Sequence, residues 1–185
     1  MKIEETPIKD LIIISPRIFN DERGYFFESY SERRFLEHEL SHKYVQDNES
    51  YSTYGTVRGL HLQKGVFAQT KLVRVIKGKV LDVALDLRIG SPTYGQHFSV
   101  ELSEENKKQF LVPKGFAHGF SVLSKEAIFS YKCDQFYNQE SEGGVLYNDP
   151  YLNIDWKIPA EKINVNEKDK NLSSFKEITE EIQRK

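Results

Sequence analysis

The stretch Val57-Arg58-Gly59-Leu60-His61-Leu62-Gln63 predicts a β-strand in which a cation, a glycine and an imidazole stand among apolar residues. Side chains alternate along a strand, so His61 is expected to share a face with Gly59 and Gln63. An imidazole that points into the interior of a β protein is either a hydrogen-bonded core side chain or a candidate base. The choice depends on what the rest of the chain places around this strand.

On both sides of this strand the chain alternates short apolar runs with turn residues. Strands are predicted at 11–15, 25–30, 71–76, 80–87, 96–102, 109–112, 116–123 and 127–136, whereas 44–52 is polar. The turn Lys77-Gly78-Lys79 predicts a hairpin between 71–76 and 80–87. Short helical pieces are expected after Ser31, at 103–106 and, as an amphipathic surface helix, at 175–182. Many short strands with frequent turns favour a β-sandwich or barrel.

Composition limits the function classes. A length of 185 residues with 38% hydrophobic residues suits one domain with a sizeable core. A net charge of −2 without a basic stripe argues against nucleic-acid binding. The single cysteine, Cys133, excludes an internal disulfide. No apolar run spans a bilayer, and residues 1–10 are too polar for a signal peptide, so we expect a soluble cytoplasmic protein without membrane contact.

Further polar residues fall within apolar strands: Lys71, Tyr131 and His118, with Arg58 close to His61. Each alone is more often structural than catalytic. A strand lysine usually faces solvent, and a strand tyrosine usually packs against the core with its hydroxyl at the rim. His118 is the hardest to explain structurally, because its neighbours Ala117 and Gly119 leave space beside the ring.

Two common site types find little support in the sequence. A strand-borne metal site would need a second histidine where Gln63 stands, and His38, His42 and His97 form no ligand-spaced pair with His61. A serine hydrolase would need a Gly-x-Ser-x-Gly turn, which is missing. A metal-free pair of base and acid remains. His61 would take a proton, Tyr131 would give one, and Lys71 or Arg58 would stabilise an oxyanion.

Several longer blocks occur in a characteristic order. They are Asp21 to Glu28, Val45 to Ser50, Arg58 to Gln63, Ala68 to Val75, Asp86 to Arg88 with Ser91 to Thr93, Val112 to Phe120, Tyr131 to Cys133 and Tyr147 to Pro150. Over about residues 12–169 the chain thereby resembles the dTDP-4-dehydrorhamnose 3,5-epimerase family.

The resemblance implies a mainly β fold, a cupin-type double-stranded β-helix (jelly roll) with short peripheral helices. It implies one epimerase domain over 1–185, with a core at about 12–157 and a C-terminal extension at 158–185. A homodimer whose N-terminal segments cross between partners, a nucleotide-sugar substrate (a dTDP-4-keto-6-deoxyhexose), and no metal or other cofactor are also implied.

The resemblance also implies residue roles. His61 matches the general base, Asp169 the carboxylate that orients it, Lys71 the cation that stabilises an enolate, and Tyr131 the acid on the opposite face. The remaining matches are to substrate contacts: Arg23, Phe26, Glu28, Gln46, Asp47, Asn48, Arg58, His118, Tyr137, Glu142 and Lys168. Among them, Phe26 matches a pocket-wall aromatic and Tyr137 the ring that stacks on thymine.

Some positions depart from the family pattern. The aromatic residue that usually follows the histidine is Leu62, the usual Glu-Arg-Gly is Glu142-Gly143-Gly144, and the first tyrosine of the thymine pocket is Phe136. These changes spare His61 and Tyr131 but leave room for another nucleotide or sugar. An epimerase that acts at C3 only, one for another nucleotide 4-keto sugar, and a non-catalytic sugar-nucleotide-binding cupin therefore stay open.

Overall fold

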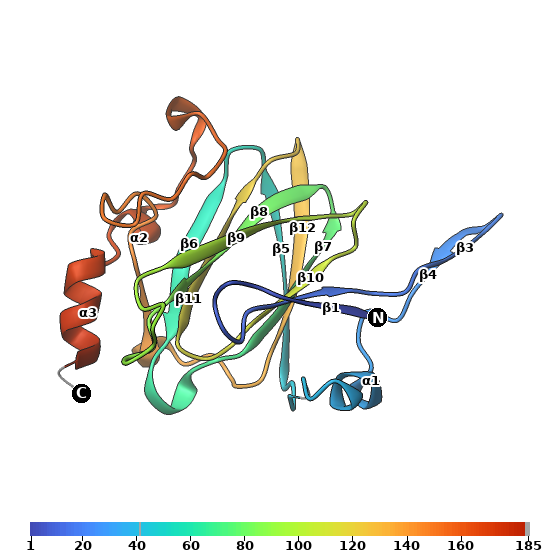
Figure 1. Ribbon diagram of the computed structural model, residues 1–185. Coiled ribbons are helices and arrows are strands. Elements are labelled where there is room, and N and C mark those ends of the chain that lie inside the picture. Colours follow the sequence, from blue (N-terminus) through green and yellow to red (C-terminus); the bar gives the residue numbers. More distant parts are fainter. Residues whose placement is uncertain (41, 184–185) are drawn as a thin grey trace.

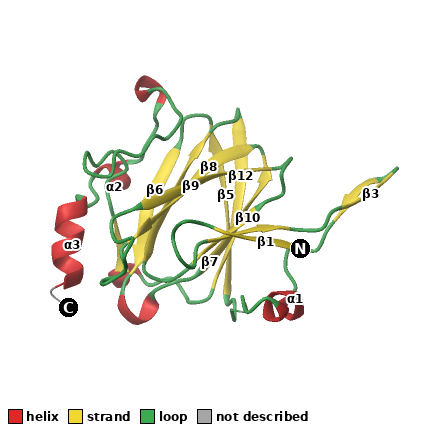
Figure 2. Ribbon diagram, viewed as in Figure 1, coloured by secondary structure: helices red, strands yellow, loops and turns green. Residues whose placement is uncertain are grey.

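The protein is described here by a computed structural model that covers residues 1–40 and 42–183. Two antiparallel β-sheets pack face to face as a jelly roll, with short helices around them (Figures 1 and 2). The mainly β jelly roll expected from the sequence is confirmed. Across the described residues, every helix is too short or too polar to span a lipid bilayer.

The strands divide into a six-stranded sheet, a five-stranded sheet and a separate hairpin. The first has the order β1 (Lys2–Glu5), β2 (Ile12–Ser15), β10 (Gln109–Val112), β7 (Lys71–Lys77), β12 (Glu126–Cys133) and β5 (Gln46–Thr53). The second has the order β13 (Glu142–Gly144), β6 (Val57–Gln63), β11 (Phe116–Val122), β8 (Lys79–Asp86) and β9 (His97–Ser103). The hairpin consists of β3 (Phe19–Asp21) and β4 (Gly24–Phe26).

The alternation of side chains gives each sheet two buried faces. In β8, Val80 and Ala84 point toward the six-stranded sheet and join the core between the sheets, which includes Phe110 and Phe129. The intervening residues, such as Leu81, belong to a second cluster on the outer face. Because both faces of β8 are buried, hydrophobic residues occur at its inward-facing and at its outward-facing positions.

Helices and loops cover the two outer faces. On the five-stranded sheet, the outward side chains of β6 and β8 are covered by α3 (Phe175–Gln183), through Ile178, and by the preceding loop, through Leu152 and Trp156. On the six-stranded sheet, Phe35 of α1 (Glu32–Glu37) packs on Ile12 of β2. The remaining helices are α2 (Glu167–Lys170) and the 3-10 turns η1 (Gly65–Phe67), η2 (Gln139–Ser141) and η3 (Ala160–Lys162). The amphipathic helix predicted at 175–182 is confirmed as α3.

The structure differs from the sequence-based predictions in several places. β7 and β8 form no hairpin, because the turn at Gly78 leads the chain from one sheet into the other. Alternation shows that two runs are strands but not that they pair with each other. The polar run at 44–52 contains strand β5, whose inward side chains are polar. The single helical turn predicted at 103–106 is present, closed by a hydrogen bond from the N–H of Lys107 to the carbonyl of Ser103 at 3.1 Å. The strand predicted at 25–30 ends at Phe26.

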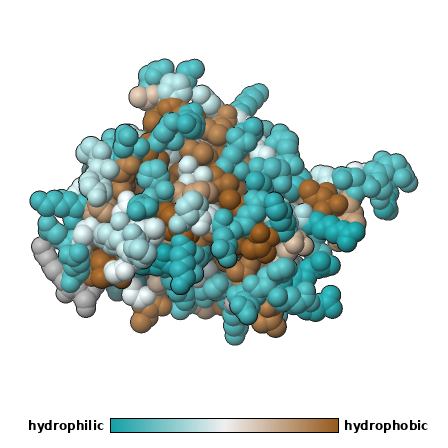
Figure 3. Space-filling view, viewed as in Figure 1, coloured by the Kyte–Doolittle hydropathy of each residue, from teal (hydrophilic) through white to brown (hydrophobic). Residues whose placement is uncertain are grey.

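The β3–β4 hairpin, called the arm below, projects from the body of the molecule (Figure 1). All six residues of its two strands are exposed, including the aromatic rings of Phe19, Tyr25 and Phe26. In the space-filling view, apolar side chains interrupt the hydrophilic surface near the base of this projection (Figure 3). Exposed aromatic side chains on a thin projection indicate a surface that is covered by something else.

A buried carboxylate fastens the loop between β8 and β9. Asp86, at the end of β8, is fully buried and accepts hydrogen bonds from Arg88, Ser91 and Thr93 at 2.6–3.0 Å. Arg88 also pairs with Asp10 at 2.7 Å. Burial by itself raises the pKa of Asp86, but the hydrogen bonds outweigh this effect and lower the pKa from 3.8 to about 2.

Replacement of Asp86 with asparagine is expected to cost about 3 kcal/mol of unfolding free energy, because a buried ion pair loses one partner. The folded-state pKa lies below the unfolded value, so the ionised carboxylate stabilises the fold above about pH 4. This contribution, about 2 kcal/mol, is lost as the pH falls toward 2 in the wild type but not in Asp86→Asn. Urea unfolding followed by the fluorescence of Trp156, the one tryptophan, measures both effects.

The matched control is Asp10→Asn, since Asp10 pairs with the same arginine but is 49% exposed. We expect it to cost less than about 1 kcal/mol. Equal losses in the two variants would show that Asp86 contributes no more than a surface ion pair.

Candidate active site

A bulge in β6 brings Arg58 and His61 to the same face of the strand. His61 is the register partner of His118 and Arg58 that of Phe120, so Gly59 and Leu60 together oppose Gly119. Residues three apart in a regular strand point to opposite faces. The extra residue of the bulge brings Arg58 and His61 back to the same face. Because Phe120 lies in the core between the sheets, both Arg58 and His61 face the six-stranded sheet.

Glycines make this bulge possible. A Cβ atom on Gly59 would lie 2.6 Å from the Cα of Gly119, and one on Gly119 would lie 2.6 Å from the carbonyl oxygen of Arg58. Gly59 also has a φ of 118°, which side-chain-bearing residues rarely adopt. The position of His61 therefore depends on two facing glycines.

His61 forms a pair with a buried carboxylate. Its Nε2 lies 2.8 Å from Oδ1 of Asp169, and the other oxygen of Asp169 accepts the backbone N–H of Gly59 at 3.0 Å. Asp169 is 1% exposed and lies on α2, where the side chain of Asn166 caps the helix by accepting the N–H of Asp169 at 2.7 Å. Burial raises the pKa of Asp169, but the bonds from His61 and Gly59 outweigh this and lower it.

The pair fixes which nitrogen of His61 is available. With the ionised carboxylate of Asp169 accepting a proton from Nε2, the lone pair of the neutral ring lies on Nδ1. The side chain of His61 is 32% exposed, so the ring is not enclosed by protein on all sides. The arrangement is that of an oriented general base.

Lys71 and Tyr131 face His61 from the other sheet. They lie on the adjacent strands β7 and β12, and the ammonium of Lys71 is 5.9 Å from the centre of the Tyr131 ring. Burial lowers the pKa of Lys71 and raises the pKa of Tyr131. Tyr131 packs on Phe129 at 6.1 Å, and Phe129 stacks with His118 at 6.2 Å, so these rings connect the two sheets. The region between the sheets that His61, Lys71 and Tyr131 face is called the cavity below.

A second histidine–aspartate pair lies beside the first. Nε2 of His118 is 2.8 Å from Oδ1 of Asp82, and both side chains are buried. Sequence reasoning included His118 but missed Asp82. The sequence does place Asp82 on the inner face, because it is two residues from both Val80 and Ala84, which belong to the core between the sheets. A carboxylate buried there needs a hydrogen-bond partner.

Further polar side chains form two connected groups at one end of the cavity. Gln46 accepts the backbone N–H of Tyr137 at 3.1 Å and donates to Asn48 at 3.0 Å, and Asn48 donates to the sulfur of Cys133 at 3.7 Å. These contacts join β5 and β12 to the segment that carries Tyr137.

In the second group, Glu142 accepts bonds from the Tyr137 hydroxyl at 2.8 Å and from Lys168 at 2.7 Å. Burial raises the pKa of Glu142, but these two bonds outweigh it and lower the pKa. Arg58 stands at the rim, where its guanidinium donates to Ser52 at 3.0 Å.

A family model described as dTDP-4-dehydrorhamnose 3,5-epimerase matches residues 5–177. The chain belongs to the dTDP-4-dehydrorhamnose 3,5-epimerase family. The family resemblance inferred from the sequence blocks is confirmed.

Relatives within this epimerase family cover almost the whole chain. The crystal structure of the epimerase from Elizabethkingia anophelis is 58% identical, covers 96% of this chain and 97% of that chain, and has a TM-score of 0.91. The epimerase of Pseudomonas aeruginosa is 49% identical over 95% of this chain and 96% of its own length. That of Legionella pneumophila, solved in complex with dTDP-4-keto-L-rhamnose, is 48% identical, covers 98% and 96% of the two chains, and has a TM-score of 0.93. These neighbours have the cupin fold, so the cupin-type jelly roll is confirmed.

Four of the residues that resemble the epimerase family's substrate contacts lie away from His61 in this chain. Asp47 points to the outer face of β5, is 68% exposed and pairs with Lys132 at 3.0 Å. Any contact of Asp47 with a ligand between the sheets would therefore use its backbone. Arg23 and Phe26 are exposed on the arm, and Glu28 pairs with Arg34 of α1 at 2.6 Å.

Within residues 1–40 and 42–183, no three or more histidine, cysteine, aspartate or glutamate side chains are grouped so as to bind a metal ion.

Proposed function

We propose that this chain epimerises dTDP-4-dehydro-6-deoxy-D-glucose at C3 and C5, giving dTDP-4-dehydro-L-rhamnose. The observation that carries the proposal is the arrangement of an oriented histidine, His61 with Asp169, on one sheet and of Tyr131 with Lys71 on the facing sheet. A base and an acid on opposite walls suit inversion at carbon, which a binding protein would not require. The names of the relatives support the same reaction.

The first step is removal of a proton from carbon. C3 and C5 both lie next to the C4 carbonyl, so loss of either hydrogen gives an enolate with its charge on O4. Nδ1 of His61 takes the proton, and the imidazolium is stabilised by the carboxylate of Asp169. The ammonium of Lys71 stabilises the enolate oxygen, an effect worth about 3 kcal/mol for a single oxyanion donor.

The second step returns a proton from the opposite face. The hydroxyl of Tyr131 donates it to the same carbon, and exchange with solvent then restores both side chains. Burial raises the pKa of Tyr131, which keeps the hydroxyl protonated at neutral pH. The cycle moves protons only and transfers no electrons to an acceptor, so it requires no redox cofactor.

The nucleotide would bind at the end of the cavity formed by Tyr137, Gln46 and Glu142. The exposed ring of Tyr137 offers a surface for stacking of thymine. Arg58 at the rim is placed to pair with the diphosphate. Lys168 and Asp169 both come from residues 158–185, which supports one epimerase domain over 1–185 rather than a separate extension.

The proposal is tested by incubation of the substrate in heavy water. We expect deuterium at both C3 and C5, detected by NMR and mass spectrometry of the recovered nucleotide sugar. Deuterium at C3 alone would indicate a C3-only epimerase, and turnover with another nucleotide only would change the substrate. No exchange at either carbon would disprove the epimerase function.

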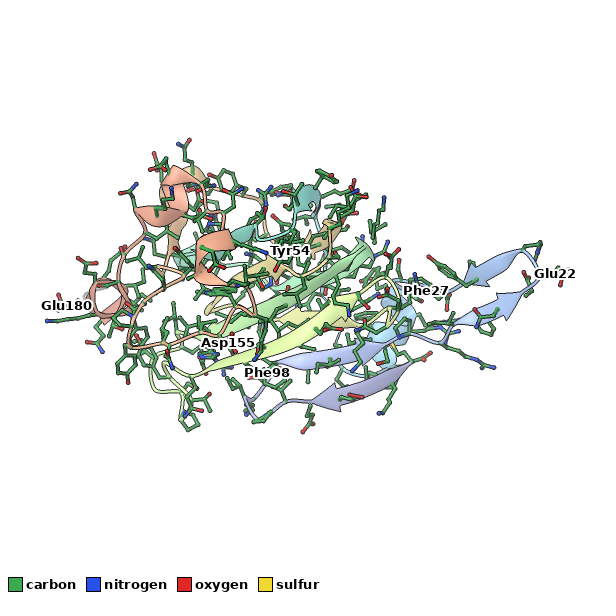
Figure 4. The ribbon with its side chains drawn as sticks, turned by 90° about the horizontal axis from the view of Figure 1, so that it is seen from above. Glu22, Phe27, Tyr54, Phe98, Asp155 and Glu180 are labelled. Carbon is green, nitrogen blue, oxygen red and sulfur yellow. The ribbon has the colours of Figure 1, made fainter. Side chains whose placement is uncertain are left out.

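We also propose that the protein is a homodimer in which the arm of each copy reaches the cavity of the other. Arg23 and Phe26 match substrate contacts, yet they lie on the arm, which projects away from the body of the molecule (Figures 1 and 4). A second copy related by a two-fold axis would cover the exposed arm and complete the cavity.

A heterodimer purified through two tags tests this crossing. One chain carries His61→Asn and the other carries Arg23→Ala. If the arms cross, the intact Arg23 of the first chain meets the intact His61 of the second, and one of the two cavities is complete. We expect about half of the wild-type activity. The control heterodimer pairs a doubly substituted chain with a wild-type chain and should be nearly inactive. Reversed activities in the two heterodimers would show that each arm serves its own chain.

A further inference from the structure

The arm has little ability to set its own direction. Its strands β3 and β4 have three residues each, and all six residues are exposed. An isolated two-stranded hairpin of this length is marginally stable in water. Figure 4 shows Glu22 at the far tip and Phe27 where the hairpin joins the body. The position of the tip must therefore be determined by contacts at the base.

One of these contacts comes from the turn between β9 and β10. The ammonium of Lys107 donates to the hydroxyl of Tyr25 at 2.8 Å and lies 4.0 Å from the centre of the same ring. Tyr25 lies on β4, two residues after Arg23 and one before Phe26. Its ring is also 6.0 Å from that of Phe27, over which the guanidinium of Arg74 lies at 5.9 Å.

The turn that carries Lys107 is itself tightly fixed. The side chain of Asn106 accepts the backbone N–H groups of Ser103 at 3.1 Å and Lys108 at 2.9 Å, and it donates to the carbonyl of Glu101 at 3.0 Å. Lys107 has a left-handed φ of 52°, which directs its side chain out of the turn. A rigid turn gives the ammonium of Lys107 a defined position.

The strand that follows this turn, β10, contacts the chain just after the arm. Gln109, 1% exposed on β10, donates from Nε2 to the carbonyl of Ser29 at 2.6 Å. The turn and β10 thus contact the chain at Tyr25 and at Ser29. Between these two points lie Phe26 and Glu28, which match substrate contacts.

We propose that Lys107 is a positioning residue that sets the direction of the arm and thereby places Arg23 and Phe26 in the cavity of the second copy. This inference rests on the proposed function, in which the arms cross between partners. Lys107 does not touch substrate. It acts through Tyr25, so its loss should weaken substrate binding and leave the proton-transfer groups intact.

The test compares Lys107→Met with Lys107→Arg and with the matched control Lys108→Met, which removes the same charge from the same turn. We expect Lys107→Met to raise KM about tenfold with kcat within about twofold, the effect of losing a cation–π contact and its hydrogen bond. Lys107→Arg keeps a cation over the ring and should restore the wild-type KM. Lys108→Met should behave as wild type.

A second readout does not depend on turnover. Trypsin should cleave after Arg23 faster in Lys107→Met than in Lys108→Met, because the arm is less ordered. If the wild type is an active dimer and Lys107→Met changes neither KM nor the rate of trypsin cleavage, the role of Lys107 is overturned and the proposed function is not affected. A wild-type protein that is monomeric or inactive would instead overturn the proposed function, and the catalytic part of this inference with it.

Discussion

Replacement of His61 with asparagine is expected to slow deuterium exchange at C3 and C5 by at least about 10³-fold, the contribution of a general base. Asparagine still offers a donor to Asp169, so the bulge at Gly59 and the buried carboxylate keep their partners. The variant lacks a nitrogen lone pair toward the substrate and therefore loses catalysis without losing the cavity. Exchange is followed by NMR in heavy water, and binding of a product analogue by calorimetry should be nearly unchanged.

Two further variants make this result specific. Asp169→Asn should slow exchange less, by about 10²-fold, because the base remains but its orientation and charge partner change. His97→Asn is the matched control, since His97 lies at the edge strand β9 and contacts the carbonyl of Leu152 at 3.1 Å. Exchange within about tenfold of wild type in His61→Asn would place the base elsewhere, with His118 as the nearest alternative.

Most strands were predictable because their residues alternate, but the pairing of strands was not. The runs at 71–76 and 80–87 carry the same pattern as a hairpin, and only the packing of the two sheets reveals that Gly78 turns a corner between them. The local sequence pattern shows whether a segment is a strand. Which strand it pairs with is determined by contacts between residues that are distant in sequence.

The site shows the same division between local and distant information. His61, Lys71 and Tyr131 stand out because polar groups in apolar strands need a reason. The shared face of Arg58 and His61 depends on a bulge that alternation does not reveal. Asp169 is 108 residues from His61 in sequence, and no local pattern links them.

Alternation along β5 determines the direction of the Asp47 side chain. Side chains of consecutive strand residues point to opposite faces, so Gln46 and Asn48 point between the sheets and Asp47 points outward. The arm holds Arg23 and Phe26 away from His61 of the same chain, and they would reach the site only in the proposed dimer.

Replacement of Tyr131 with phenylalanine is expected to separate exchange from inversion. His61 still removes the proton, and its imidazolium, after exchange with heavy water, returns a deuteron to the face it came from. Deuterium should therefore enter with retained configuration, while inversion falls by about 10²–10⁴-fold, because the acid on the opposite face is lost. The ring of phenylalanine keeps the packing on Phe129 and the position under Lys71.

The configuration of the labelled sugar distinguishes Tyr131→Phe from His61→Asn, in which both exchange and inversion are lost. Tyr137→Phe is the matched control, because it removes only a hydroxyl that bonds to Glu142 at 2.8 Å and should affect KM rather than stereochemistry. Wild-type inversion in Tyr131→Phe would require another proton donor on the six-stranded sheet. Lys71 is the candidate there, since burial lowers its pKa and thereby makes its ammonium a stronger proton donor. Loss of exchange together with inversion would instead mean that Tyr131 takes part in removing the proton, and that the two walls of the cavity have their roles reversed.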